Sequence, residues 1–380
     1  MKILYVLDSL GTGGAERSTA DLWYYLRSKG LEPTIVVLRH RTEGIEKEIL
    51  QKGFQVFFLK GKGIASQCSE LSLLIKKIKP NIVHSILFKS NLRVRLCRLR
   101  TKFIHVESLV NCTYDRVRLK DPRISILSFY YYKYLDHFTS VLTDKFLAIT
   151  QSVKTHYVNE QDIPKNKIDV LYRGRDENPF LPQRNELRIN YRRELGLAED
   201  TILVLHVGRQ EFQKGHLVLL TAIRLIETKI DKPVAFVFLG RKGNSSPDIS
   251  TFLKENPSQT KLYWLDHRYD VEQWMISSDI FVFPSLYEGL GGVLIEAQAA
   301  SLPVICSDIP VLNEVVMRNK NALMFEAGNG QQLGECLMDM INNKDKRVQF
   351  GNYSLHHFRS KFLLHDINEK TLAFYKQLLK

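Results

Sequence analysis

The chain has 380 residues, 44% of them hydrophobic and 25% charged, a composition typical of a globular protein with two domains or one large one. It has no apolar run near the ~18 residues of a membrane span and no signal-peptide core, and its five scattered cysteines form no Cys-x-x-Cys pair, which favours a cytoplasmic protein without a disulfide framework. The net charge of +13 lies almost entirely in residues 1–170, where 28 Lys and Arg stand against 16 Asp and Glu, whereas residues 171–380 hold 26 and 25, so the two halves are expected to meet different partners.

Short β-branched or aromatic runs alternate with helical segments along the first half of the chain. The predicted strands there are Lys2–Leu7, Thr34–Leu38, Gln55–Leu59, Ile82–Ser85, Phe103–Val106, Lys145–Ile149 and Ile168–Leu171. The predicted helices between them include Ala15–Lys29, Leu71–Lys79, Leu92–Leu99 and Ser152–Asn159. Strands that alternate with helices predict βαβ units and a mostly parallel, doubly wound α/β sheet.

The alternation stops at Arg173–Pro182, a polar stretch, and then starts again. The strands predicted in the second half are Ile202–Val207, Val234–Leu239, Lys261–Leu265, Ile280–Phe283 and Val304–Cys306. The sequence therefore predicts two Rossmann-like domains joined near residue 175, with a last helix at Asp366–Lys380. Because such domains bind ligands at the carboxyl ends of their strands, site residues are expected in the loops that follow strands.

The loop after the first strand is rich in glycine, with Gly11, Gly13 and Gly14 ahead of a predicted helix. Such glycines let backbone N–H groups approach a phosphate at a helix N-terminus. A dinucleotide fingerprint would need a further glycine where Glu16 stands, and the second strand is followed by Arg39 instead of an acid. A nicotinamide enzyme is therefore disfavoured, although Arg39 leaves an NADP enzyme open, and a plain tight turn is the alternative.

Two cations follow the first strand of the second half. Gly208 ends that strand, and Arg209 and Lys214 come before the next predicted helix. Arginine can bind two oxygens side by side and lysine acts as a point charge, so the pair suits a diphosphate. The alternative is a solvated loop, where isolated Arg and Lys usually lie.

The sharpest feature of the second half is a pair of glutamates around a glycine-rich turn. Glu288 precedes Gly289, Gly291 and Gly292, and Glu296 lies in the apolar helix that follows. The loop amides and the helix start would hold an anion, and Glu288 would reach a ligand hydroxyl. Glu296 is an acid in an apolar setting and needs a partner such as a ribose diol. The alternative is a structural acid paired with a buried arginine or with backbone amides.

The order and spacing of these segments resemble retaining glycosyltransferase family 4. The segments that carry the resemblance are Gly13–Glu16, Val207–Arg209 with Lys214–Gly215, Glu288–Glu296 with seven residues between the glutamates, Ser301–Ile305 and Asn321–Phe325. The resemblance implies the GT-B architecture, in which two Rossmann-like domains face each other across a cleft. Residues 1–172 would bind the acceptor and residues 173–359 the nucleotide-sugar donor, and a helix at about 360–380 would pack back onto the first domain.

The resemblance also implies a function and a site. The protein would be a retaining, hexosyltransferase-type enzyme of cell-surface polysaccharide synthesis that moves a sugar from a UDP- or GDP-linked donor to a glycan or a lipid-diphosphate-linked glycan. It would need no cofactor and no metal, because two cations would stabilise the leaving diphosphate and the chain has no Asp-x-Asp motif. Arg209, Lys214 and Glu288 would act in catalysis. The donor-binding residues would be Gly13, Gly14, Gly208, Arg209, Lys214, Glu288, Gly289, Leu290, Gly291, Gly292, Val293 and Glu296.

One segment departs from the family pattern. Many members carry a histidine in the loop after the fifth strand, near the reacting sugar, whereas His105 here falls within the predicted strand and Glu107 and Ser108 take the loop position. His105 or Glu107 would then contact the sugar or the acceptor. The alternative for His105 is a core histidine.

A basic stretch at Lys89–Lys102 and an aromatic cluster at Phe129–Tyr134 lie in the half that the resemblance assigns to the acceptor. Leu92, Leu96 and Leu99 follow helical spacing and would be buried, which would leave the arginines outward. Basic residues near aromatic ones suit an anionic membrane surface, so peripheral attachment to the inner face of the cell membrane is expected. The alternatives are a nucleic-acid surface and a solvated helix beside a tyrosine-rich core helix.

Three other functions remain open on the sequence alone. A sugar-nucleotide epimerase on a similar scaffold would release its product without any acceptor. A phosphorylase would need a lysine-bound pyridoxal site, which nothing in the chain indicates. A basic nucleic-acid-binding protein would leave the residues of the donor loops unexplained, so no nucleic-acid partner is expected.

Overall fold

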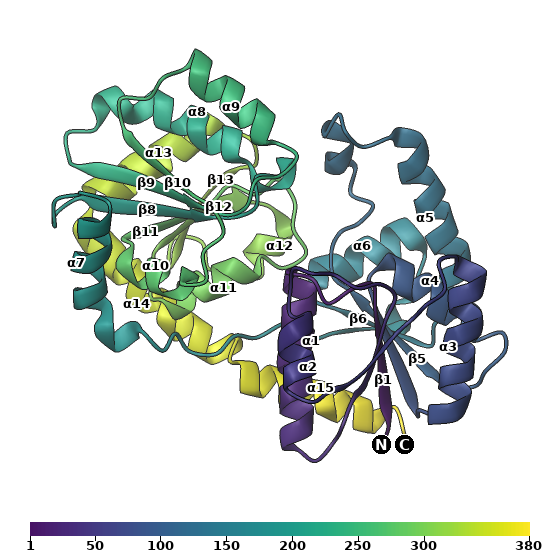
Figure 1. Cartoon of the computed structure of the whole chain (residues 1–380). Helices are drawn as coiled ribbons and strands as arrows, with labels where there is room; N and C mark the ends of the chain where they lie inside the picture. Colours follow the sequence, from purple (N-terminus) through teal and green to yellow (C-terminus); the bar gives the residue numbers. More distant parts are fainter. The chain divides into compact units, whose positions relative to one another are not determined.

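The computed structural model describes residues 1–380 and divides into two units (Figure 1). Unit 1 consists of Met1–Gly174 together with Leu364–Lys380, and unit 2 consists of Arg175–Leu363. The chain therefore passes from one unit to the other twice. The domain boundary predicted from the sequence was between residues 172 and 173.

Unit 1 is built on a seven-stranded sheet in the order β3-β2-β1-β4-β5-β6-β7, and every neighbouring pair is parallel. Its strands are β1 (Ile3–Leu7), β2 (Thr34–Val37), β3 (Gln55–Phe58), β4 (Ile82–Ile86), β5 (Ile104–Leu109), β6 (Lys145–Ala148) and β7 (Ile168–Val170). Its helices are α1 (Gly14–Ser28), α2 (Glu46–Gln51), α3 (Ile64–Ile78), α4 (Phe88–Cys97), α5 (Ile126–Ser140), α6 (Gln151–Gln161) and α15 (Leu364–Gln377), with short 3-10 turns at Arg116–Lys120 and Lys165–Lys167.

Unit 2 is built on a six-stranded parallel sheet in the order β10-β9-β8-β11-β12-β13. Its strands are β8 (Ile202–Val207), β9 (Val234–Leu239), β10 (Lys261–Leu265), β11 (Ile280–Phe283), β12 (Val304–Asp308) and β13 (Ala322–Glu326). Its helices are α7 (Arg184–Glu194), α8 (His216–Ile226), α9 (Ser246–Glu255), α10 (Val271–Ser277), α11 (Gly292–Ala299), α12 (Pro310–Asn313), α13 (Gly330–Asn342) and α14 (Lys344–Lys361), with 3-10 turns at Leu181–Gln183, Phe212–Lys214 and Glu227–Lys229.

The predicted doubly wound α/β architecture is confirmed in both units. Each sheet is buried on both faces, as parallel sheets are: Ile3, Tyr5 and Leu7 of β1 point into one core of unit 1, and Leu4 and Val6 into the other. The strand order reverses between β1 and β4 in unit 1 and between β8 and β11 in unit 2. Ligands of doubly wound sheets bind beyond the carboxyl ends of the strands at such reversals, so the loops after β8 and β11 are where a site of unit 2 belongs.

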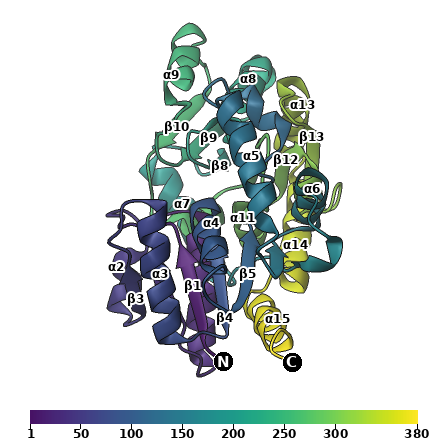
Figure 2. The same cartoon turned by 90° about the vertical axis from the view of Figure 1, so that its right-hand side faces the viewer.

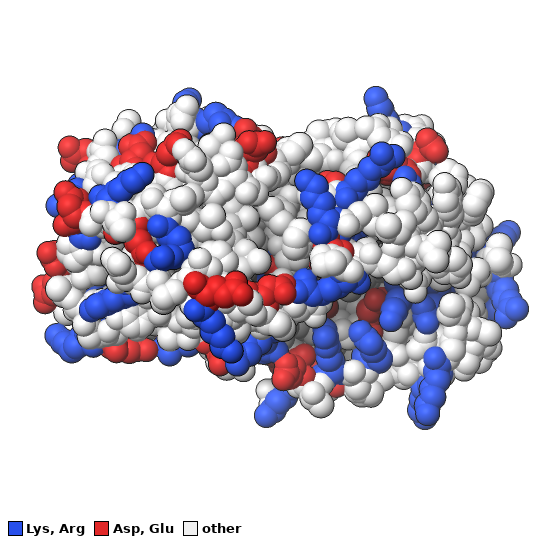
Figure 3. All heavy atoms as spheres, turned by 90° about the horizontal axis from the view of Figure 1, so that it is seen from above, with Lys and Arg blue, Asp and Glu red and all other residues white.

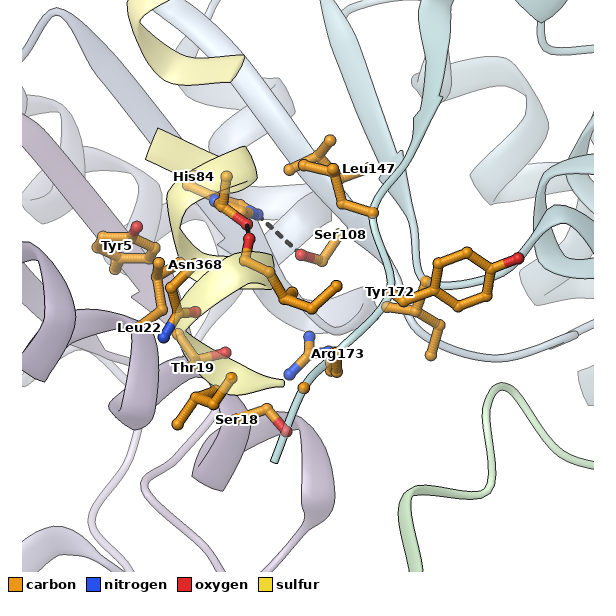
Figure 4. A pocket seen from close by; sticks show the side chains of 16 residues that line it. Tyr5, Ser18, Thr19, Leu22, His84, Ser108, Leu147, Tyr172, Arg173 and Asn368 are labelled. Atoms are coloured by element: carbon orange, nitrogen blue, oxygen red, sulfur yellow. Dashed lines mark hydrogen bonds between the residues drawn. The ribbon is translucent and has the colours of Figure 1, made fainter. Parts of the chain in front are cut away.

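The last helix, α15, is joined to the sheet of unit 1 by a buried polar chain. The Tyr375 hydroxyl is 2.9 Å from the Tyr5 hydroxyl and 2.6 Å from Nδ1 of His84, whose Nε2 is 2.8 Å from the Ser108 hydroxyl. Burial lowers the pKa of His84 to about 3, so the ring is neutral. A cavity of about 60 Å³ lies beside this chain, lined by α1, α15 and the segment around Arg173 (Figure 4).

A buried group of charges connects α4, β5 and α5. The Arg95 guanidinium binds both carboxylate oxygens of Glu107 at 2.6 and 3.0 Å and reaches Asp136 at 2.5 Å. Burial raises the pKa of Glu107, Arg95 opposes this shift and Asp136 adds to it. The Tyr114 hydroxyl donates a further hydrogen bond to Asp136, at 2.8 Å. The charges are thus satisfied inside the protein, as buried charges must be.

The prediction that the arginines of Lys89–Lys102 lie outward is therefore wrong for Arg93 and Arg95, whereas Arg100 is exposed. Arg95 is 1% exposed, and Arg93 is also buried, with its Nε 2.5 Å from Oε1 of Gln67. Leu99, which the spacing placed in the buried stripe, is 68% exposed. The reason is electrostatic, because the carboxylates of Glu107 and Asp136 lie under α4 and hold a guanidinium there.

Replacing Arg95 by methionine should destabilise unit 1 strongly. The substitution leaves two carboxylates buried without a counter-charge, which typically costs about 3–5 kcal/mol. Denaturant unfolding of the full chain would measure the loss. Arg100→Met, at an exposed position just past α4, is the matched control and should change the stability little. Equal stability of the two variants would contradict the importance of the buried charges.

Candidate active site

The loops after β8 and β11 meet at one edge of the sheet of unit 2. These two strands are neighbours, with Phe281 opposite Leu205. Past their ends, the Leu286 amide donates to the Gln213 carbonyl at 2.8 Å, and Nε2 of Gln213 donates to the Tyr287 carbonyl at 2.8 Å. Each loop is therefore held in place by the other.

Two glycines allow the backbones at this edge to approach each other. Gly215 has φ of +65°, and a Cβ atom there would lie 2.0 Å from the Pro284 carbonyl oxygen. Gly240 has φ of +148°, and a Cβ atom there would lie 2.1 Å from the Gly208 carbonyl oxygen. No other residue type fits either position without moving the neighbouring chain.

Lys214 and Glu288, which the sequence placed in a common site, form an ion pair at this edge. The Lys214 ammonium lies 2.5 Å from Oε1 of Glu288 and 5.1 Å from the centre of the Phe283 ring. The side chain of Glu288 is 8% exposed and that of Lys214 is 19% exposed. Water is therefore largely excluded from the pair, and its charges lie in a setting of low polarity.

Arg209, the other predicted cation, follows β8 directly and presents its charge to solvent. Its side chain is 65% exposed, and the nearest carboxylate oxygen, on Glu211, is 3.8 Å away. Gly208 lies before it, packed against the aliphatic stem of Lys214. Arg209 and Lys214 thus lie on the same loop. The Arg209 side chain is exposed, whereas the Lys214 ammonium is paired with Glu288.

The glycine turn leads directly into α11. Gly291 adopts φ of +75° as the residue before the helix, and Leu290 is buried. The first two amides of α11, those of Gly292 and Val293, have no partner within the helix, as at any helix start. Such amides favour an anion. Gly289 precedes them in the same turn.

Glu296 lies in a different setting from the one expected. Its side chain is 32% exposed, although its neighbours on α11 are buried, and Oε1 accepts a hydrogen bond from Nε of Arg175 at 2.6 Å. Arg175 stands where the chain enters unit 2, and its Nη2 lies 2.5 Å from the position that a Cβ of Gly292 would occupy. The structural alternative, a glutamate paired with an arginine, is therefore present, and no sequence pattern indicated Arg175 as the partner.

The predicted site residues of unit 1 lie on two features. Gly13 and Gly14 stand at the start of α1, where a Cβ on Gly13 would meet the carboxylate of Glu16 at 2.4 Å. The acid that replaces the fingerprint glycine therefore folds back over its own loop. Neither glycine belongs to unit 2, which carries the other predicted donor residues.

His105 and Glu107 are both part of the core of unit 1. His105 is fully buried with Nε2 2.8 Å from the Ser85 hydroxyl, and burial holds the pKa of its ring well below the usual range. The prediction that Glu107 lies in a loop is wrong, because β5 continues through Leu109. Arg95 supplies the counter-charge that lets the strand carry an acid into the core.

Two further properties of the structure bear on its chemistry. No three His, Cys, Asp or Glu side chains come together in an arrangement that could ligate a metal ion. None of the helices combines the length and the apolar character needed to cross a membrane.

The chain resembles known proteins along most of its length. Residues 12–178 match the model of Glycosyltransferase Family 4, and residues 188–357 match that of Glycosyl transferases group 1. A capsular polysaccharide biosynthesis glycosyltransferase, CapM of Staphylococcus aureus, is 27% identical over 62% of this chain and 62% of its own length. An Escherichia coli UDP-Gal:alpha-D-GlcNAc-diphosphoundecaprenol alpha-1,3-galactosyltransferase is 26% identical over 73% of this chain and 71% of that protein.

Solved structures with the same fold cover the whole chain. HepE of Anabaena, in complex with UDP and glucose, matches 99% of this chain and 100% of its own with a TM-score of 0.83 and 17% identity. A glycosyltransferase of Rickettsia africae matches 100% of this chain and 98% of its own with a TM-score of 0.82 and 21% identity. Two parallel sheets of this order define the GT-B class. The chain belongs to the group 1 glycosyl transferases of glycosyltransferase family 4.

Replacing Gly215 by alanine should damage both stability and nucleotide binding. A left-handed backbone costs alanine about 1–2 kcal/mol, and at Gly215 the contact with Pro284 adds to it. Gly196→Ala is the matched control, because Gly196 has φ of +63° with open space around it. Denaturant unfolding and titration with UDP would separate the two variants. Similar losses in both would show that the close approach at Pro284 is unimportant.

Proposed function

We propose that the protein is a retaining glycosyltransferase that moves a sugar from a nucleotide-sugar, UDP- or GDP-linked, to a glycan or lipid-diphosphate-linked glycan in cell-surface polysaccharide synthesis. Unit 2 binds the donor and unit 1 the acceptor. The observation that carries the proposal is the shielded Lys214–Glu288 pair beside the exposed Arg209, at the strand-order reversal of unit 2. Family membership supports the same reaction.

The cations act on the leaving group. Transfer breaks the bond between the anomeric carbon and the diphosphate oxygen, so negative charge grows on the diphosphate as the bond breaks. Lys214 is fixed before the reaction by Glu288, on a loop held by Gln213, and a fixed charge stabilises a developing charge without reorganisation. Because the two cations bind the departing diphosphate more strongly than the intact donor, they raise the rate of transfer. This chemistry needs no metal ion.

The glutamates and the glycine turn hold the rest of the donor. Glu288 accepts hydrogen bonds from hydroxyls of the transferred sugar and keeps Lys214 in place. Glu296, oriented by Arg175, accepts from the ribose hydroxyls. Backbone amides of Gly289–Val293 bind the sugar and the phosphates at the start of α11.

The proposal that unit 1 binds the acceptor at a membrane rests on the net charge of this unit and on the similar proteins. Unit 1 contains 32 Lys and Arg and 18 Asp and Glu, a net charge of +14, whereas unit 2 contains 22 and 23, a net charge of −1. Blue cations accordingly outnumber red acids over the part of Figure 3 that belongs to unit 1. Together with the diphosphoundecaprenol substrate of the Escherichia coli relative, this charge supports a cytoplasmic enzyme attached peripherally to an anionic membrane face, where a lipid-linked acceptor is presented.

Lys214→Ala should lower the turnover of the preferred donor more than the affinity for it. The lost charged hydrogen bond is worth about 1.5–3 kcal/mol, which corresponds to about a ten- to hundredfold fall in kcat. Thermal shifts with a panel of UDP- and GDP-sugars would first identify the donor, and product analysis by NMR would give the anomeric configuration. Lys254→Ala, exposed on α9, is the control. Unchanged turnover in folded Lys214→Ala, or release of an altered nucleotide-sugar without acceptor, would refute the proposal.

The variants Glu288→Gln and Glu296→Gln should distinguish the contact to the transferred sugar from the contact to the nucleotide ribose. Glu296→Gln should weaken the binding of bare nucleoside diphosphate severalfold, because its contact does not involve the sugar. Glu288→Gln should leave that affinity nearly unchanged and lower transfer. Calorimetric titration with the diphosphate and initial rates with the nucleotide-sugar measure the two effects. Equal losses of diphosphate affinity would contradict the division of roles.

A further inference from the structure

Helix α5 is amphipathic in the opposite sense to most helices at a protein surface, which turn their apolar side to the core. Along its outward side, four residues of α5 and Val141, the residue after its last turn, are large, apolar or aromatic, and between 57% and 85% exposed. They are Leu127, Tyr131, Tyr134, Phe138 and Val141. The spacing of four, three, four and three residues places all five on one face, which we call the apolar stripe.

The inward side of α5 holds polar groups beside the buried Phe129. Asp136 is buried and binds Arg95 and Tyr114. Lys133 donates to Glu160 of α6 at 2.6 Å, and Ser140 is buried. Charges that would normally make the outer face soluble are therefore used inside the unit, and the outer face is left to apolar side chains. The alternative that the tyrosines form a core helix is wrong for Tyr131 and Tyr134.

No element of unit 1 covers the apolar stripe. In Figures 1 and 2 the outer side of α5 carries no other helix or strand of this unit. Single exposed apolar residues are common on soluble proteins, but a contiguous row of five on one helix face is typical of a surface that meets a partner.

The charges around the stripe identify the kind of partner. Ahead of α5 the 3-10 turn carries the exposed cations Arg116 and Lys120. At the C-terminal end of α5, Arg98 binds Asp144, which lies three residues past Val141. The exposed Arg100 follows Arg98 by two residues and therefore lies near that end. No acid stands among the five stripe residues or between them on the exposed side, since Asp136 is buried.

We propose that the apolar stripe of α5 lies in the boundary between lipid headgroups and acyl chains of an anionic membrane. Leucine, phenylalanine and valine enter the apolar layer, the two tyrosines place their hydroxyls among the headgroups, and the flanking cations meet anionic lipid. This inference rests on the membrane-bound acceptor of the proposed function, and it names the surface that holds the enzyme there. It replaces the arginine face of α4, which is buried.

The proposal predicts an apolar component of binding that salt does not remove. Attraction between surface charges is screened at high salt, whereas burial of leucine and phenylalanine is not. Full-length protein should therefore sediment with vesicles of phosphatidylglycerol and phosphatidylethanolamine at low salt and retain part of this binding at high salt. Loss of all binding at high salt would leave an electrostatic surface only and would overturn the insertion of α5.

A triple variant tests the stripe directly. Leu127→Gln, Tyr134→Gln and Phe138→Gln together should lower the vesicle partition coefficient about a hundredfold or more, given what burying such side chains contributes. The matched control replaces three other exposed residues by glutamine, namely Leu50, Leu73 and Tyr269, and should bind like the wild type. Both variants should retain UDP affinity and transfer to a water-soluble acceptor, so a failure of the membrane surface is distinguished from a failure of the proposed function.

A fluorescent probe and a mass measurement decide between lipid and a second copy of the chain. Phe138→Trp should shift its emission to shorter wavelength when vesicles are added, and Tyr269→Trp, in unit 2, should not. Light scattering of the lipid-free wild type should give a monomer. A dimer that the triple variant abolishes would overturn the proposal in favour of self-association, as would an unchanged emission of Phe138→Trp.

Discussion

A charged side chain that is buried away from water needs an opposite charge beside it inside the protein. This constraint determines how α4 and α5 are oriented in unit 1 and how the candidate site residues are held in unit 2. In unit 1 the carboxylates of Glu107 and Asp136 draw Arg95 inward, which sets the orientation of α4 and ties α5 to β5. In unit 2 Glu288 draws in Lys214, so the cation that we propose to bind the diphosphate is already held at the sheet edge. Similar pairing by Arg175 orients Glu296.

The fold could be predicted from the sequence because parallel strands buried on both faces appear as uninterrupted apolar runs. The bounds of β8, β9, β10 and β11 agree residue for residue with the predicted ranges. The prediction failed where a polar residue interrupts a strand. The sequence predicted that β5 ends before Glu107, yet the strand continues to Leu109. Glu107 can lie within the strand because Arg95 of α4 is its partner. β13 was not among the predicted strands, because Ala322–Glu326 ends in an acid.

The candidate site was predictable as far as position after a strand determines it. Arg209, Lys214 and Glu288 follow β8 and β11, and adjacent parallel strands bring such loops together. The sequence does not show which residues pair when they are distant along the chain. Arg175 is 121 residues from its partner Glu296, and Arg95 is 41 residues from its partner Asp136. Helical spacing in α4 was visible, but the side of that helix that faces the core depended on those partners.

The return of α15 to unit 1 constrains how the two halves can be recombined. Tyr375 completes the hydrogen-bonded chain from Tyr5 to His84 and Ser108, so the first half of the polypeptide lacks part of its own interior. A chimaeric enzyme that takes unit 2 from a relative must join the chains twice, near Gly174 and near Leu363, where Arg175 and Leu363 pair in parallel. A single junction would separate α15 from the sheet it evolved with, so the natural module for exchange is the inserted middle of the chain and not its second half.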